Sequence, residues 1–253
     1  MLGENRKEII IKLLNKQGTV KVADLQKIFN TSLQTVRRDL EILEKEGVIK
    51  KVYGGAILNK SFLQPLSLET REKSSLNEKD EISNTALKFI DEGDSIALND
   101  STTNLMIAKK LSEHFKNLTI ITNSLEIIST LSEVKGFNVI LAGGILNSEN
   151  KAFYGEITEN ILDKFVINKA FICVSSFSLK NGITDYPLEE VKIQQKLMEI
   201  SQNSFIIADS NKLESSSLIK VRDISEKEIL ITDHNIPKEI EENYKNAKIT
   251  IIK

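Results

Sequence analysis

The chain has 253 residues, 40% of them hydrophobic and 28% charged, which suits one large or two smaller globular domains and excludes a disordered or fibrous protein. No apolar run approaches the roughly 18 residues that a transmembrane helix requires, and residues 1–18 lack the continuous apolar stretch of a secretory signal. Cys173 is the single cysteine, so no intrachain disulfide can form, and we expect a cytoplasmic protein with no membrane partner.

The net charge of −2 conceals a basic N-terminal region. Residues 1–58 hold eleven Lys and Arg against seven Asp and Glu, so the remainder of the chain is acidic. A basic region joined to an acidic body predicts that the basic region binds a polyanion. The residue pattern within the region decides between that hypothesis and chance variation in a Lys-rich sequence.

Residues 1–58 have the pattern of an α+β winged helix-turn-helix domain. Apolar residues spaced by three and four positions predict helices over residues 5–17, 22–29 and 33–46. Ser32 can cap the third helix, and the three-residue turn before it is typical of a helix-turn-helix. Two β-prone runs around Gly54-Gly55 predict a hairpin, the wing.

The exposed face of the third helix carries the candidate base contacts. At 100° per residue its apolar stripe centres between Val36 and Leu40, and Gln34, Thr35 and Arg38 lie opposite. Arg bonds guanine and Gln bonds adenine in the major groove, so we expect this face to read base edges. The alternative is a face that is merely solvated.

The other candidate contacts are expected at the DNA backbone. Arg37 on the helix flank and the helix N-terminus near Ser32 suit phosphate groups. In the wing, Lys50, Lys51 and Tyr53 can reach the backbone or the neighbouring groove. The predicted partner of this domain is therefore double-stranded operator DNA.

These residues resemble the DNA-binding domain of the DeoR (deoxyribose-operon repressor) family of transcriptional regulators. The resemblance covers residues 31–40, Leu43-Glu44, Gly47 and residues 53–56 at fixed spacing. The family usually has His before the two glycines, where this chain has Tyr53. The resemblance implies a winged helix-turn-helix that binds an operator.

Residues 59–78 are expected to link two domains. The segment is polar, contains Pro65 and shows no sustained apolar periodicity. Arg71 and Lys79 match an arginine and a lysine that the DeoR family has in this region. From the residues alone, we expect Arg71 to be a solvated charge in the linker.

Residues 79–253 alternate strand and helix patterns, which predicts an α/β effector-sensing domain with a mostly parallel sheet and covering helices. The expected strands cover residues 94–98, 118–122, 137–142, 169–174, 204–208, 228–232 and 248–252. The expected helices cover residues 79–91, 103–115, 124–133, 156–166 and 187–202. Because ligands of such sheets bind at the carboxyl ends of the strands, the residues after each strand are the candidates for a site.

Hydroxyl, amide and carboxyl side chains, two glycines and one lysine follow the expected strands. The candidate effector-binding residues are Asn99, Asp100, Ser101, Thr102, Thr103, Asn123, Ser124, Gly143, Gly144, Thr184, Glu189 and Lys212. Hydroxyls at a helix N-terminus form an anion cradle with the free backbone N–H groups. Together these residues suit a phosphorylated polyol, although any one Ser, Thr or Asn alone is more simply a helix cap.

This part of the chain resembles the effector domain of the DeoR family, which is similar to sugar-phosphate isomerases of the ribose-5-phosphate isomerase and glucosamine-6-phosphate deaminase type. The matching stretches are residues 98–103, 122–125, 142–144, 169–171, 182–184 and 208–212. The family commonly has Asp-Ser-Gly-Thr-Thr where this chain has Asn99-Asp100-Ser101-Thr102-Thr103, so a carboxylate has moved to Asp100. The resemblance implies a phosphorylated sugar as the effector.

Two other functions fit parts of the sequence. A sugar-phosphate isomerase needs a base, and Asp100, Asp185, Glu189 and Asp209 are the available carboxylates. The two histidines and the cysteine form no readable triad or metal cluster, so we expect no catalytic residue, metal or cofactor. A DNA-binding architectural protein with an inert body would not need the polar residues at the strand ends.

We interpret the sequence as a transcriptional regulator, a repressor of an operon for sugar uptake or catabolism. One winged helix-turn-helix contacts one operator half-site, so a homodimer or homotetramer is expected.

Overall fold

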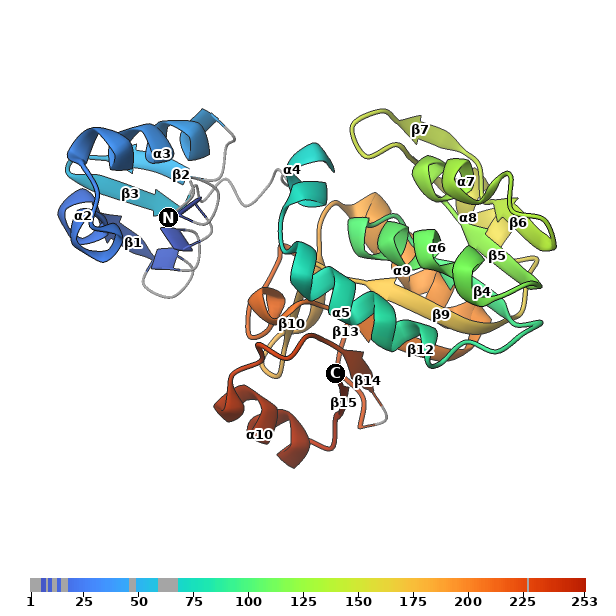
Figure 1. Ribbon diagram of the computed structural model, residues 1–253. Coiled ribbons are helices and arrows are strands. Elements are labelled where there is room, and N and C mark those ends of the chain that lie inside the picture. Colours follow the sequence, from blue (N-terminus) through green and yellow to red (C-terminus); the bar gives the residue numbers. More distant parts are fainter. Residues whose placement is uncertain are drawn as a thin grey trace. The chain divides into compact units, whose positions relative to one another are not determined.

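The computed structural model of the chain describes residues 6, 7, 9, 10, 13, 14, 18–45, 49–58, 68–226 and 228–253. The chain divides into two compact units, Met1–Leu66 and Ser67–Lys253 (Figure 1). None of the helices in the described ranges is long and apolar enough to cross a membrane.

The N-terminal unit is a helix-turn-helix with a small antiparallel sheet. Its labelled elements are β1 (Thr19–Lys21), α2 (Val22–Phe29), α3 (Leu33–Lys45), β2 (Ile49–Val52) and β3 (Gly55–Leu58). The strands pair in the order β1-β3-β2. Ile10 and Leu14, within the expected first helix, are helical and pack with Val36, Leu40 and Leu43 of α3 in one apolar cluster. The expected winged helix-turn-helix is therefore confirmed.

Two glycines shape the wing. Gly54, between β2 and β3, has φ +78°, a conformation that L side chains rarely adopt. A Cβ atom on Gly55 would collide with the carbonyl oxygen of Val20, where β3 pairs with β1. The turn and the close strand contact therefore each require glycine.

The C-terminal unit is built around a seven-stranded sheet in the order β15-β14-β12-β9-β4-β5-β6, with every neighbouring pair parallel. The strands of this sheet are β4 (Ser95–Leu98), β5 (Leu118–Thr122), β6 (Phe137–Leu141), β9 (Ile167–Cys173), β12 (Ser201–Ile207), β14 (Ile229–Ile231) and β15 (Thr250–Ile252). The helices are α4 (Leu68–Lys73), α5 (Leu76–Leu87), α6 (Thr102–His114), α7 (Leu125–Leu131), α8 (Glu156–Leu162), α9 (Leu188–Ile200) and α10 (Lys238–Asn246), with a 3-10 turn η1 (Ser210–Lys212). The expected parallel α/β domain is confirmed.

Both faces of the sheet are covered. Ile96 and Leu98 of β4 pack with α5, α6 and α7, whereas Ala97 between them packs with α8, α9 and α10 on the opposite face. Strands buried on both faces are apolar at successive positions, which is why they stand out in the sequence as continuous apolar runs.

The chain order creates a switch point between β4 and β9. From β4 the chain moves outward through β5 to β6, then crosses to β9 on the other side of β4 and continues through β12, β14 and β15. In open parallel sheets, ligands bind outside the carboxyl ends of the strands at such a point. The topology therefore predicts a ligand site near the residues that follow Leu98 and Cys173.

Several elements differ from the sequence-based expectation. Residues 68–78, expected in the linker, form α4 and the start of α5, while residues 59–67 lie outside the described residues. The short strands β7 (Ile145–Asn147), β8 (Ala152–Tyr154), β10 (Ser176–Ser178), β11 (Gly182–Asp185) and β13 (Ile219–Arg222) were not expected, nor was α10. β7 pairs with β8, and β10, β11 and β13 form a second small sheet.

Candidate functional site

The outer face of α3 is exposed in the N-terminal unit. Gln34, Arg37 and Arg38 are exposed and Thr35 is half-buried. Ser32 caps the helix, since its Oγ accepts a hydrogen bond from the backbone N–H of Thr35 at 3.2 Å. The α3 residues expected to contact DNA therefore lie outside the apolar core of the unit.

An ion pair fixes the opposite side of α3. Arg6 donates from Nε and Nη2 to the two carboxyl oxygens of Asp39 at 2.7 and 3.1 Å, and Asp39 is buried. This bidentate pairing raises the pKa of Arg6 and ties the N-terminal segment to α3. The rotation of α3, and hence the direction of Arg38, follows from this contact and the apolar cluster.

The three expected DNA contacts of the wing are exposed, and one of them, Lys51, also pairs with α3. Lys50 and Tyr53 are exposed. Lys51 pairs with Glu44 of α3 at 3.0 Å, and its backbone N–H also donates to Glu44 at 3.0 Å. Lys51 therefore holds the wing against α3, a role beyond the DNA contact expected from its charge.

In the C-terminal unit, Asn99 bridges β4 and β9 at the switch point. Its Oδ1 accepts from the N–H of Cys173 at 2.8 Å, and its Nδ2 donates to the carbonyl of Cys173 at 3.0 Å and to Glu190 at 2.9 Å. Asn99 is fully buried. Its amide is thus engaged in joining the two strands and α9, rather than presented to a ligand.

Asp100 is a buried residue of the loop that follows β4. Its backbone N–H donates to Asn123 Oδ1 at 3.0 Å, and its carboxyl lies 3.5 Å from the hydroxyl of Tyr154. Burial raises the pKa of Asp100 to about 6, although the positive charge of Arg71 and a hydrogen bond with Ser124 lower it. The carboxyl of Asp100 therefore lies beside a phenol and is influenced by the positive charge of Arg71.

The start of α6 has the geometry of an anion site. Ser101 caps the helix by accepting from the N–H of Asn104 at 2.9 Å. The N–H groups of Thr102 and Thr103 precede the first intrahelical bonds and have no carbonyl of the helix to bind. Thr102 is half-buried and Thr103 is buried. Free N–H groups and the helix dipole favour an anion at this end.

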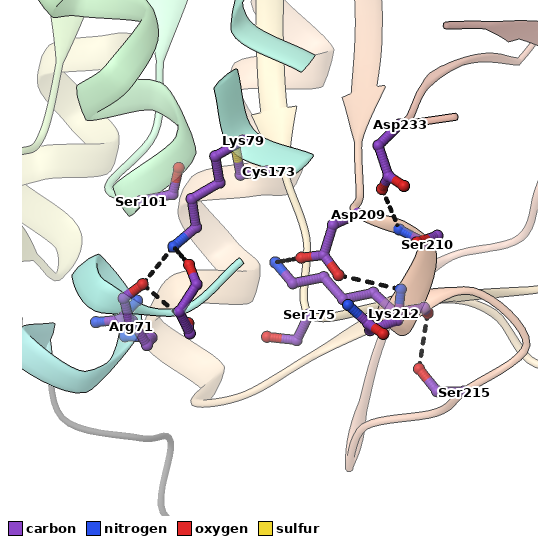
Figure 2. Close-up of polar contacts among 12 residues, drawn as sticks. Arg71, Lys79, Ser101, Cys173, Ser175, Asp209, Ser210, Lys212, Ser215 and Asp233 are labelled. Atoms are coloured by element: carbon purple, nitrogen blue, oxygen red, sulfur yellow. Dashed lines mark hydrogen bonds and ion pairs between the residues drawn. The ribbon is translucent and has the colours of Figure 1, made fainter. Parts of the chain in front are cut away.

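Three cations lie around this end of the sheet (Figure 2). Lys79 is buried, and its ammonium donates to the carbonyls of Ser74, at 2.7 Å, and Arg71. Burial, with a smaller effect from the charges of Lys212 and Arg71, lowers the pKa of Lys79 to about 8, against the opposing charge of Asp209. Figure 2 shows the three side chains at the same end of the sheet, and together they can neutralise a polyanionic ligand.

Asp209 positions Lys212 at the carboxyl end of β12. Its carboxylate lies 3.8 Å from the ammonium of Lys212 and accepts from the N–H of Asn211 at 3.1 Å. The N–H of Ser210 donates to Asp233 at 2.6 Å, which fixes the same short turn (Figure 2). The turn η1 is thus tied to the ends of two strands.

Family models match both units. Residues 6–62 match the DeoR-like helix-turn-helix domain, and residues 74–234 match the DeoR C terminal sensor domain, which alone covers more than half of the chain. The chain belongs to the DeoR family. It is accordingly a DNA-binding transcriptional regulator with a sensor domain.

Curated DeoR-family relatives align over most of their length. The lactose phosphotransferase system repressor of Staphylococcus epidermidis is 32% identical over 91% of this chain and 92% of its own length. The regulator IolR of Bacillus subtilis is 36% identical over 80% of each chain. The putative aga operon transcriptional repressor of Escherichia coli O157:H7 is 29% identical over 98% of this chain and 92% of its own.

Among solved structures, ribose 5-phosphate isomerase A from Methanocaldococcus jannaschii aligns over 55% of each chain, with 13% identity and a TM-score of 0.40. So distant a likeness adds nothing to the fold that the strand pairing itself establishes.

Three further expected effector residues of this DeoR sensor domain have surroundings that do not depend on a ligand. Glu189 is exposed, and the next residue, Glu190, is the carboxyl that turns inward. Thr184 lies in β11, where its hydroxyl accepts from the N–H of Ser217 at 2.8 Å. Gly144 is required by packing, since a Cβ atom there would lie 2.7 Å from the carbonyl oxygen of Tyr154.

The remaining expected residues after β5 and β6 have mixed surroundings. Asn123 holds two loops, accepting from Asp100 and donating to the carbonyl of Phe153 at 3.1 Å. Ser124 caps α7. Nothing lies within 4 Å of the space that a Cβ atom on Gly143 would occupy, so this glycine leaves room beside the backbone.

Four residues at this end were not among the expected site residues. Arg71 was expected to be a solvated charge, but its Nη2 donates to Asn150 at 2.9 Å. Lys79, Tyr154 and Glu190 are buried. Arg71 and Lys79 match charged residues of the DeoR family, and this match was the one feature of the sequence that could have indicated a role at the site for them.

Proposed function

We propose that this DeoR-family regulator represses an operon for sugar uptake or catabolism, and that a phosphorylated sugar bound by its sensor domain modulates operator binding. Two relatives are named as repressors, of a lactose phosphotransferase system and of an aga operon. These names support a sugar-related operon for this chain.

The surroundings of Lys79 carry the proposal of an anionic effector. Burying a charged group is costly unless it is paired, and Lys79 makes no ion pair with a carboxylate in the part of the chain that the structure describes. Lys212, Arg71 and the first turn of α6 add positive potential at the same end of the sheet. A phosphate group would supply the missing negative charge and accept several of these donors at once.

The sugar part of the effector would then contact the polar groups after β4, where the Asp100 carboxylate can accept hydrogen bonds from the sugar hydroxyls. We propose Ser101, Thr102, Thr103, Lys79, Arg71 and Lys212 as the phosphate contacts.

In the N-terminal unit we propose Gln34, Thr35 and Arg38 as base contacts. We propose backbone contacts for Ser32, Arg37, Lys50, Lys51 and Tyr53. Because one such unit fits one operator half-site, we propose a homodimer or homotetramer acting in the cytoplasm. We also propose that the sensor domain binds its ligand without turning it over.

Fluorescence anisotropy on the DNA upstream of its own gene tests this function. A panel of phosphorylated sugars is titrated against the matching free sugars. We expect one phosphorylated sugar to shift the DNA-binding curve and its free sugar to leave it unchanged. DNA binding that no member of the panel shifts would contradict the proposed effector class, and loss of the phosphorylated sugar from the mixture would contradict the binding-only role.

A further inference from the structure

Helix α4 is short and has no buried side chain to hold it against the rest of the domain. It has six residues, Leu68–Lys73, and none of them is buried. A helix this short is not stable by itself in water, so its position depends on contacts with the rest of the sensor domain. α4 is also the first described element after β3 of the DNA-binding unit, with residues 59–67 between them.

Lys79 provides one of those contacts. Its ammonium donates to the carbonyls of Arg71 and Ser74, at the end of α4 and in the turn that follows (Figure 2). The Ser74 hydroxyl donates to the same Arg71 carbonyl at 3.0 Å. Carbonyls at a helix C-terminus need partners from outside the helix, and a lysine is a favourable one.

Arg71 provides a second contact, through its side chain. Its Nη2 donates to Asn150 Oδ1 at 2.9 Å, in the connection between β7 and β8. Asn150 in turn donates to the Tyr154 hydroxyl at 3.4 Å, and that hydroxyl lies 3.5 Å from the Asp100 carboxyl, so these contacts connect Arg71 to the loop before α6. Arg71 therefore spans from α4 to the region where the phosphate is proposed to bind.

We propose that the phosphorylated effector binds Lys79 and Arg71 together with the start of α6, and so fastens α4 to the sheet. α4 is then the segment through which ligand occupancy reaches the DNA-binding unit. An ammonium has three donors, and the two carbonyls of α4 and its turn occupy two of them, which leaves one for a phosphate oxygen. This inference rests on the proposed function, because it uses the same site.

The coupling follows from unequal binding to two states. A ligand changes operator affinity only if it binds the DNA-competent and the incompetent states differently. A phosphate that contacts Lys79 and Arg71 binds more tightly when α4 is in place than when α4 has come away. Ligand binding therefore shifts the population toward the fastened α4.

Hydrogen exchange of the full-length protein, with inorganic phosphate as the probe, tests the inference. Peptides covering residues 68–75 report on α4, and peptides covering residues 102–106 report on the start of α6. At a phosphate concentration about ten times its Kd, openings that require ligand release become about tenfold rarer. We expect this slowing in both peptides, relative to sodium chloride at the same ionic strength.

Three variants test whether the effect of phosphate on α4 depends on Arg71 and Lys79. In Arg71→Gln and Lys79→Gln, we expect phosphate to give less than a twofold slowing in the α4 peptide. Lys73→Gln removes the same charge from an exposed side chain of α4 and should behave as the wild type.

The two peptides distinguish an error in the proposed phosphate site from an error in the proposed fastening of α4. If phosphate slows exchange at the start of α6 but not in α4, the fastening of α4 is wrong and the proposed site remains. If phosphate slows neither peptide, the proposed phosphate site is wrong, and the fastening is wrong with it. Fast exchange in β9 would identify a variant that fails to fold. Lys79→Arg is the second variant at this position: it keeps the positive charge, and phosphate should still slow exchange in both peptides.

Discussion

The hydroxyl of Tyr154 donates to the carboxyl of Glu190 at 2.9 Å, beneath the loop that follows β4. The carboxyl of Asp100 lies 3.5 Å from the same hydroxyl, so one phenol stands between two buried acids. Burial, followed by the negative charge of Asp100, raises the pKa of Glu190 to about 8. Near neutral pH the pair therefore holds a proton that neither carboxyl would hold in water.

Stability should fall as the pH rises because of Glu190. Its pKa is higher in the folded protein than in the unfolded chain, so the folded state binds more protons between about pH 4.5 and pH 8. The stabilisation is complete below the unfolded pKa and is lost as the pH rises through the folded pKa. Chemical denaturation at pH 5 and pH 8 should show this loss for the wild type.

Glu190→Gln should reduce that loss. A glutamine can accept from Asn99 through Oε1 and donate to Tyr154 through Nε2, so the fold has a neutral replacement that titrates nowhere in this range. We expect the difference between the two pH values to shrink by about 1 kcal/mol or more. Glu189→Gln, at the exposed neighbour, is the control and should keep the wild-type difference. Equal curves for wild type and Glu190→Gln would refute the raised pKa.

Phosphate affinity should depend on the protonation of Lys79. Its pKa of about 8 means that the ammonium is lost just above neutral pH, and a bound phosphate would raise that pKa. Calorimetric titration with inorganic phosphate should show affinity falling about tenfold between pH 7.5 and pH 9.5. In Lys79→Arg the guanidinium stays charged throughout, so the affinity should be nearly constant. A wild-type affinity that is constant as well would mean that Lys79 does not contact the phosphate.

The main strands of the sensor domain could be predicted because they are buried on both faces and form continuous apolar runs. β9 is covered on both faces, and its run from Ala170 to Cys173 is apolar or small at every position. β7 and β8 form a two-stranded hairpin of three residues each, and Ile145 and Leu146 of β7 are exposed. Such short strands give no repeating pattern that a sequence could reveal.

The candidate site was predicted less completely than the fold. Glu189 and Glu190 are adjacent carboxylates, and which of them faces inward is decided by the packing of α9 against the sheet. Lys79 is buried, and its ammonium donates to the carbonyls of Arg71 and Ser74. The apolar periodicity of the sequence does not predict this contact. The hydroxyls of Ser101, Thr102 and Thr103 were predictable, since a helix N-terminus after a parallel strand has one orientation.

The ion pair between Arg6 and Asp39 should stabilise the N-terminal unit. Asp39→Ala leaves the Arg6 guanidinium without this carboxylate, and we expect a lower free energy of unfolding of this unit. Limited proteolysis, followed at sites within residues 18–45, measures that opening. The double variant Arg6→Met with Asp39→Leu removes both charges and should recover most of the loss. A double variant as unstable as Asp39→Ala would show that Asp39 acts through something other than Arg6.

Arg38 should determine base preference in the operator. It is exposed on the outer face of α3, where a guanidinium can bond a guanine edge, so Arg38→Ala should cost about 1–3 kcal/mol at the preferred sequence and relax the preference there. Arg37→Ala should weaken binding to all sequences alike and lower the salt dependence by about one phosphate contact. Lys180→Ala, an exposed charge in the sensor domain, is the control. Anisotropy titrations on a set of single-base operator variants distinguish the two arginines. A uniform loss for Arg38→Ala would make Arg38 a phosphate contact and move the base-reading face of α3 toward Gln34.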